Sequence, residues 1–297
     1  MRIHADVRRA LERREPVVAL ESSVLAQGLP IPHNRSAAER MGSAIGKSGA
    51  LPAITAVVRG APAVGLDEEE LERFLRRDGV AKVSARDVPW AMVRGLDGAT
   101  TVAASLMLAA GAGVEVFATG GIGGVHFEPA FDESADLAEL ARRSMVVVCS
   151  GAKSILDLAA TWERLESLGV PVVGYRTDEL PGFYTAQTGI ALTARANEAG
   201  QIVELFRAHR ALGRPQALLV VQPPPAEHAL EREEVDEAVA RARGDAARRG
   251  IRGAAVTPFL LAAIGKITSG ASLETNLALL ERNARLAGEI ARAASPR

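Results

Sequence analysis

MVVVCSGAKSILD, residues 145–157, is a run of β-branched residues that ends in a Ser-Gly-Ala turn, after which a helical pattern begins near residue 152. A short apolar run without polar alternation is typical of a strand that is buried on both faces. Lys153 stands just after the turn, where the helix is expected to begin. Because a helix N-terminus carries positive partial charge and disfavours a cation, a lysine at this position needs an explanation.

The same succession of a strand and a helix occurs along the whole chain. Six further apolar runs predict strands at 16–20, 53–59, 80–84, 114–119, 170–175 and 217–222. Helical spacing predicts helices at about 33–48, 67–77, 100–111, 133–143, 152–168, 196–211, 231–249, 257–268 and 272–293. Short buried strands separated by helices predict an α/β fold with a mainly parallel sheet flanked by helices on both faces (α/β/α). No repeat or linker divides the sequence, so we expect a single domain over 1–297.

The composition excludes several classes of protein. A net charge of −1 argues against a nucleic-acid binder, which would show a basic stripe. Cys149 is the only cysteine, which excludes a disulfide or a zinc–thiolate site within the chain and predicts a buried, inert thiol. The N-terminus lacks the apolar segment of a secretory signal, and no run of about 18 apolar residues predicts a membrane span. We therefore expect a cytoplasmic protein that has no membrane partner.

Three ionisable side chains stand at or near the ends of predicted strands, where open α/β sheets bind their ligands. Glu21 follows the strand at 16–20 and is either a solvated carboxylate or an acid–base group. Lys82 lies inside an apolar run, where its amine either reaches solvent or is held by an anion. Lys153 is either a surface lysine or a desolvated amine. A lysine held near other cations has a lowered pKa and can attack a carbonyl as a free amine.

The segment from 116 to 137 is the richest in polar groups. TGGIGGVH (119–126) is glycine-rich, but His126 stands where a dinucleotide fingerprint requires its third glycine, and no Walker lysine follows. His126 is either an ordinary loop residue or a phosphate or sugar contact. Asp132 and Asp136 flank Ser134. They either cap a helix or provide the oxygen ligands that Mg²⁺ or Mn²⁺ prefers.

Two helices supply further candidate groups. Residues 97–101 read as a helix start, whose free backbone N–H groups could bind an anion. Asn276 and Asn283 are seven residues apart in the helix predicted at 272–293, which places both on one face. Amides that face a core or a site need hydrogen-bond partners.

Together these stretches resemble the pseudouridine-5′-phosphate glycosidase family over almost the whole chain, from about residue 16 to 291. The matching segments follow the family's order: VALESSVLAQGLP, PAITAVVRGAPAVGLDEEEL, KVSARDVP, GATTVAAS, TGGIGGVHFEPAFDESADL, SGAKSILDL, GVPVVGYRTDELPGFY, VTPFLLAAI and SLETNLALLERNARLAGEIA. The chain departs from the family in a short segment at 126–132, in Ser22 where the family often has Asn, and in Ala85 where it often has a bulkier residue. None of these departures removes a catalytic group.

The resemblance implies a reversible cleavage of the C–C glycosidic bond of pseudouridine 5′-phosphate to uracil and ribose 5-phosphate. It also implies a homotrimer with one divalent ion per subunit, commonly Mn²⁺, with Mg²⁺ possible. Carried over residue by residue, Lys153 is the covalent nucleophile, Glu21 the proton donor and Asp132 the metal ligand. The residues implied to contact substrate are Lys82, Val102, His126, Ser134, Ala135, Asp136 and Asn276.

Two other functions are compatible with the same residues. A Schiff-base lyase or aldolase that acts on another phosphosugar would use the same lysine, so only a test of substrates distinguishes it from a pseudouridine-5′-phosphate glycosidase. A catalytically silent binding protein on this scaffold would be expected to have lost Glu21, Lys153 or Asp132, and all three are present.

Overall fold

The computed structural model describes residues 1–129 and 131–295, and a sheet of 11 strands runs through it. The strands are β1 (Arg2–Ile3), β2 (Val17–Leu20), β3 (Leu51–Val58), β4 (Ala61–Val64), β5 (Ala81–Val83), β6 (Gly98–Thr100), β7 (Val116–Ala118), β8 (Val146–Cys149), β9 (Val172–Tyr175), β10 (Arg195–Ala196) and β11 (Leu218–Val221). Their order is β1-β4-β3-β2-β7-β8-β11-β9-β10, and β6 pairs with β3 and β5. Only the pairings of β3 with β4 and of β3 with β6 are antiparallel among those described. The predicted, mainly parallel sheet is confirmed.

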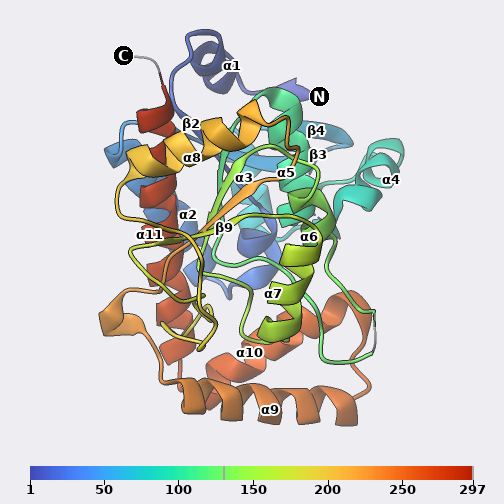
Figure 1. Cartoon of the computed structure of the whole chain (residues 1–297). Helices are drawn as coiled ribbons and strands as arrows, with labels where there is room; N and C mark the ends of the chain where they lie inside the picture. Colours follow the sequence, from blue (N-terminus) through green and yellow to red (C-terminus); the bar gives the residue numbers. More distant parts are fainter. Residues whose placement is uncertain (130, 296–297) are drawn as a thin grey trace.

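Helices cover both faces of this sheet (Figure 1). They are α1 (Ala5–Glu12), α2 (His33–Lys47), α3 (Glu68–Arg76), α4 (Val88–Val93), α5 (Val102–Ala112), α6 (Ala135–Leu140), α7 (Leu158–Ser167), α8 (Ala199–Ala211), α9 (Arg232–Arg248), α10 (Val256–Ile267) and α11 (Ala271–Ala294). On one face α11 packs against α2 and α8 and lies along β2, β7 and β8. On the other face α5 packs against α6. The pair α9 and α10 lies together at one end of the molecule (Figure 1).

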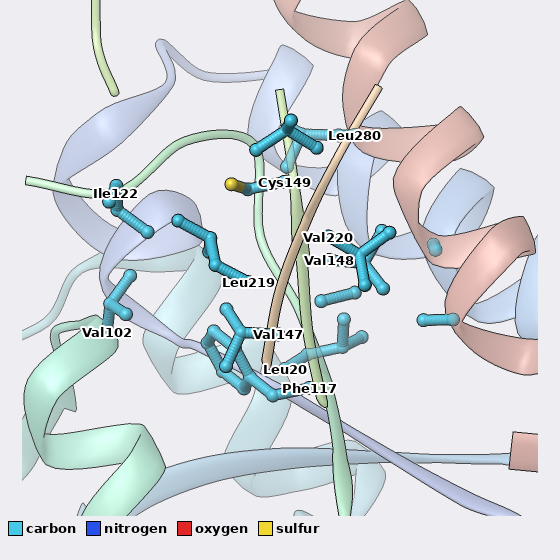
Figure 2. Close-up of a cluster of buried hydrophobic side chains, with 14 of the residues drawn as sticks. Leu20, Val102, Phe117, Ile122, Val147, Val148, Cys149, Leu219, Val220 and Leu280 are labelled. Carbon is cyan, nitrogen blue, oxygen red and sulfur yellow. The ribbon is translucent and has the colours of Figure 1, made fainter. Parts of the chain in front are cut away.

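The centre of the sheet forms the core. Every residue of β8 and β11 is buried, as expected for parallel strands covered on both faces. Figure 2 shows Phe117, Val147 and Leu219 clustered there, and the pairing register places these three residues side by side on β7, β8 and β11. Cys149 lies in the same cluster, and its complete burial raises the pKa of its thiol to about 12. The predicted inert thiol agrees with this environment.

The helix predicted at 152–168 begins later, at Leu158, where the Asp157 side chain caps it by accepting from the backbone N–H of Ala160. Residues 151–157 form a loop instead, in which Lys153 N donates to Ile122 O and Asp157 N donates to Val125 O. The placement of Lys153 at a helix N-terminus was therefore wrong, because the backbone of this segment bonds to the loop after β7.

Other differences concern short elements. The helix start predicted at 97–101 is wrong in part, because Gly98–Thr100 forms β6 and α5 begins at Val102. The elements β1, α1, β4, α4, β6 and β10 were not predicted. In the described part of the chain, no single helix is long and apolar enough to cross a membrane, and α10 and α11 reach that length only as a pair bent by 118°.

Candidate active site

The loops that follow several strands at one edge of the sheet border two adjoining open cavities, each with about 530 Å³ of space when the part open to solvent is included. Parallel strands end at the same edge, which brings residues from distant parts of the sequence together. Five residues line both cavities: Glu21, Ser23, Lys82, Lys153 and Thr257. The predicted acid and the predicted nucleophile therefore face the same space.

Glu21 is the first residue after β2, and its side chain is buried. Each carboxylate oxygen accepts one hydroxyl hydrogen bond: Oε1 from Thr119 Oγ1 and Oε2 from Ser23 Oγ, both at 2.5 Å. Thr119 follows β7, which is the neighbour of β2 in the sheet. The carboxylate is thus held in one orientation at the junction of the two cavities.

Lys153 lies in the loop after β8, and its Nζ donates to the backbone oxygen of Gly121 at 2.7 Å. Gly121 belongs to the glycine-rich loop after β7. A Cβ at Gly121 would come within 2.6 Å of the ring of Phe183, in the segment after β9, so the close approach of that segment requires glycine. Phe183 itself has a positive φ of 68°, a conformation that is uncommon outside glycine and concentrated at functional sites.

Lys82, on β5, lines both cavities, and its side chain is exposed although the surrounding protein partly desolvates its amine. This desolvation lowers the pKa of Lys82, and the charge of Lys153 lowers it further, while Glu21 and Asp136 act in the opposite direction. The two lysines therefore lie close enough to interact electrostatically where the two cavities meet.

Asp136 and Ser134 tie together the loops of the second cavity. The carboxylate of Asp136 is buried and accepts from Ala103 N at 2.9 Å, in the first turn of α5, and from Gly123 N at 2.8 Å. Ser134 is the N-cap of α6 and accepts from Asp136 N. Both residues line the cavity, and both also hold its backbone in place.

The start of α5 forms another part of the second cavity. Thr101 is its N-cap and Val102 its first residue, and both line the cavity. The buried Thr101 Oγ1 has no hydrogen-bond partner in the described part of the chain. The N–H of a first helical residue has no intrahelical partner, so the start of α5 can offer the N–H of Val102 to an anion, whereas the N–H of Ala103 is taken by Asp136.

His126 and Asp132 lie close together. His126 lines the second cavity, and partial burial lowers the pKa of its imidazole, while the charge of Asp132 opposes this shift. Its backbone N–H donates to Asp132 O at 2.9 Å. Asp132 and Ala135 are exposed and are not among the described residues that line the two cavities. Ala130, within the short segment noted at 126–132, lies outside the described residues.

The two asparagines of α11 have different surroundings. Asn276 lines the first cavity, and no donor is found for its buried Oδ1 among the described residues. Asn283 is completely buried below the site, where its Nδ2 donates to Thr119 O at 2.9 Å and to Ser150 Oγ at 3.1 Å. Its Oδ1 accepts from Gln222 Nε2 at 3.0 Å. Asn283 therefore anchors the loops after β7 and β8, which carry Thr119 and Lys153.

Several residues of the site were not predicted. Thr119 and Ser23 hold the acid, Gln222 supports Asn283, and Phe183 and Gln27 line the first cavity. Ser23 could have been found from its place two residues after Glu21. The others could not be found from the sequence, because their place in the site depends on the conformation of the loops and the order of the strands.

Comparison with known proteins shows the family. A family model described as indigoidine synthase A like protein matches residues 6–293. A pseudouridine-5′-phosphate glycosidase of Gemmatimonas aurantiaca is 64% identical over 282 residues, which cover 95% of this chain and 92% of that protein. The chain belongs to the pseudouridine-5′-phosphate glycosidase family. The resemblance inferred from the sequence is confirmed.

Two further relatives extend this result. A pseudouridine-5′-phosphate glycosidase of Chloroflexus aurantiacus is 50% identical, and the match covers 98% of this chain and 97% of that protein. The crystal structure of the prealnumycin C-glycosynthase AlnA in complex with ribulose 5-phosphate matches with a TM-score of 0.90 and 37% identity, covering 98% of this chain and 96% of that one. The pseudouridine-5′-phosphate glycosidase fold is thus shared with a structure that holds a pentose phosphate.

Proposed function

We propose that this protein reversibly cleaves the C–C glycosidic bond of pseudouridine 5′-phosphate to uracil and ribose 5-phosphate. One observation carries the proposal: an amine, Lys153, and a carboxyl group, Glu21, face the same junction between two cavities. The names of the relatives and the pentose phosphate bound by AlnA support the choice of substrate.

The two cavities suit the two halves of this substrate. The second cavity offers Lys82, His126 and the donors at the start of α5, which suit a ribose 5-phosphate. The first cavity has an apolar wall from Val24, Phe183, Pro258 and Leu261, which suits a flat base, and Asn276 adds an amide. The bond between sugar and base then lies at the junction, beside Lys153 and Glu21.

The mechanism follows from the poor leaving ability of a carbon atom. Lys153 Nζ attacks C1′, the C1′–O4′ bond breaks, and O4′ takes the proton that the attacking amine loses, so that the ribose opens. The nitrogen lone pair then forms a C=N bond as the bond from C1′ to C5 of uracil breaks, and C5 receives a proton from Glu21. One water hydrolyses the iminium, which releases ribose 5-phosphate and restores the amine and the acid. The cleavage consumes one water molecule overall.

Direct measurement of uracil tests this function. Purified protein mixed with pseudouridine 5′-phosphate should release uracil and ribose 5-phosphate in equal amounts, and the reverse mixture should form pseudouridine 5′-phosphate. Failure to release uracil, together with cleavage of another phosphosugar, would instead establish the alternative Schiff-base lyase or aldolase.

We also propose that Asp132 holds a divalent ion, Mn²⁺ or Mg²⁺. Among residues 1–129 and 131–295 no three His, Cys, Asp or Glu side chains gather into a metal site. The exposed carboxylate of Asp132 beside His126 fits an ion that keeps most of its water, because such ions are often bound by one or two carboxylates and substrate oxygens. When bound, the ion would orient substrate oxygens and stabilise developing negative charge.

Removal of the ion should slow the reaction. We expect a chelator to lower kcat/KM at least about tenfold and added Mn²⁺ to restore it, since a bound cation stabilises charge that develops on substrate oxygens. Asp132→Asn should lower the affinity for Mn²⁺, measured by calorimetry, and make the residual rate insensitive to chelator. A chelated wild-type protein with an undiminished rate would contradict the metal proposal.

We further propose a cytoplasmic homotrimer, as the family resemblance implies. The apolar residues Trp90, Met92 and Val93 on α4 are exposed, which is typical of a surface that contacts another chain. Light scattering should then give three times the 31.2 kDa of one chain. A monomer mass at all concentrations would rule the trimer out.

A further inference from the structure

Two side-chain amides of the first cavity each have an oxygen without a hydrogen-bond donor. In the described part of the chain, the buried Oε1 of Gln27 and the buried Oδ1 of Asn276 find no partner. Both residues line this cavity together with Glu21 and Lys153. Because buried polar atoms in folded proteins are nearly always hydrogen-bonded, two such oxygens in one cavity point to a ligand that brings donors.

The orientation of the Gln27 amide is set by the protein. Its Nε2 donates to the backbone oxygen of Val80 at 3.3 Å, just before the strand that carries Lys82. Rotating the amide by half a turn would place two oxygens against each other, so Oε1 remains an acceptor. Gln27 lies in a π-helical turn over Val24–Gly28, a conformation that is frequent at functional sites.

The chemistry of uracil supplies the matching donors. When uracil is linked through C5, the opposite edge of the ring presents N1–H, the C2 carbonyl and N3–H, so one donor lies on each side of one acceptor. When uracil is linked through N1, as in uridine 5′-phosphate, N3–H is the only ring N–H. Two amide oxygens at the base end of the cavity therefore fit the C5-linked base better than its N1-linked isomer.

We propose that Gln27 is a specificity-determining residue, whose Oε1 accepts one ring N–H of the C5-linked uracil while Oδ1 of Asn276 accepts the other. This inference rests on the proposed function and explains how the same site rejects the N-linked nucleotide. An N-linked base leaves one buried oxygen unpaired, and a site built to receive a donor discriminates strongly against a ligand that lacks it.

Pseudouridine 5′-phosphate and its N1-methyl and N3-methyl derivatives test the proposal. We expect each methyl group to lower kcat/KM of the wild-type protein about tenfold or more, the effect of one lost hydrogen bond to a buried group. Gln27→Met keeps the length of the side chain without the amide. This variant should lower kcat/KM for the parent substrate about tenfold. Within the variant, one of the two methyl groups should then lower kcat/KM only about twofold or less, and the other should lower it as much as in the wild-type protein.

Gln216→Met is a matched control. Like Gln27, Gln216 donates from Nε2 to a backbone oxygen, that of Leu168, and its buried Oε1 has no partner among the described residues. Unlike Gln27, it lines neither cavity. This variant should keep both methyl penalties of the wild-type protein.

If both methyl groups lower kcat/KM of Gln27→Met as much as they lower that of the wild-type protein, the inference is overturned, because the loss would then arise from steric exclusion. Trapping of ribose 5-phosphate on Lys153 with borohydride needs no base and should be unchanged in Gln27→Met. Its loss would show a structural role for Gln27 and also overturn the inference. A wild-type protein that traps ribose 5-phosphate but releases no uracil from the parent substrate would refute the proposed function itself.

Discussion

Lys153→Ala is expected to lower kcat for uracil release by about 10⁴-fold or more, because the variant loses the amine that is proposed to bond with C1′. Lys82 also lines both cavities, but the family resemblance assigns the covalent bond to Lys153, so Lys82 is not expected to replace it. Single-turnover measurement of uracil, with the enzyme in excess of the substrate and at a concentration above KM, gives the rate of the chemical step.

Borohydride trapping identifies the bond directly. Wild-type protein mixed with ribose 5-phosphate and borohydride should gain the mass of the reduced sugar phosphate at Lys153, found by peptide mass spectrometry, and Lys153→Ala should gain none. Lys47→Ala, at the exposed end of α2, is the matched control and should behave as the wild-type protein does. Normal turnover by Lys153→Ala, or a modification at Lys82, would refute the assignment.

The predicted and observed structures around Lys153 show which features the sequence can and cannot predict. The apolar run before it correctly predicts β8, because strands buried on both faces have a recognisable composition. The helical pattern after it extends too far, since Ile122 N bonds to Gly151 O and Lys153 N to Ile122 O. These bonds join segments about 30 residues apart, which periodicity within one segment does not reveal. The amine is consequently positioned by Gly121 O, and the helix macrodipole is not involved.

The surroundings of Glu21 illustrate the same limit. Its place after an apolar strand predicts that it lies at the ligand edge, and the structure places it there. The hydroxyl of Thr119, which is 98 residues away in sequence, reaches it only because β2 and β7 are neighbours. Asn283 fixes the backbone of Thr119 from a third element. Short strands such as β1 and β10, with two residues each, are below the length at which alternation can be read.

Glu21→Gln is expected to lower kcat about 10²- to 10⁴-fold, the usual contribution of a positioned general acid. The amide has the shape of the carboxyl group but has no proton to give to C5 of uracil. Its NH₂ group also cannot accept from a hydroxyl, so one of the bonds from Ser23 and Thr119 has to reverse. Uracil release under single-turnover conditions measures the loss.

The step that fails in this variant should be specific. Glu21 acts on the base, so Glu21→Gln should still form the imine with ribose 5-phosphate, and borohydride should trap it on Lys153 as in the wild-type protein. In D₂O the wild-type protein should release uracil with one deuterium at C5. Ser23→Ala, which removes one hydrogen bond but keeps the acid, should lose about tenfold or less. Loss of trapping in Glu21→Gln would place Glu21 in the attack on C1′, and a rate within about twofold of the wild-type protein would remove it from the mechanism.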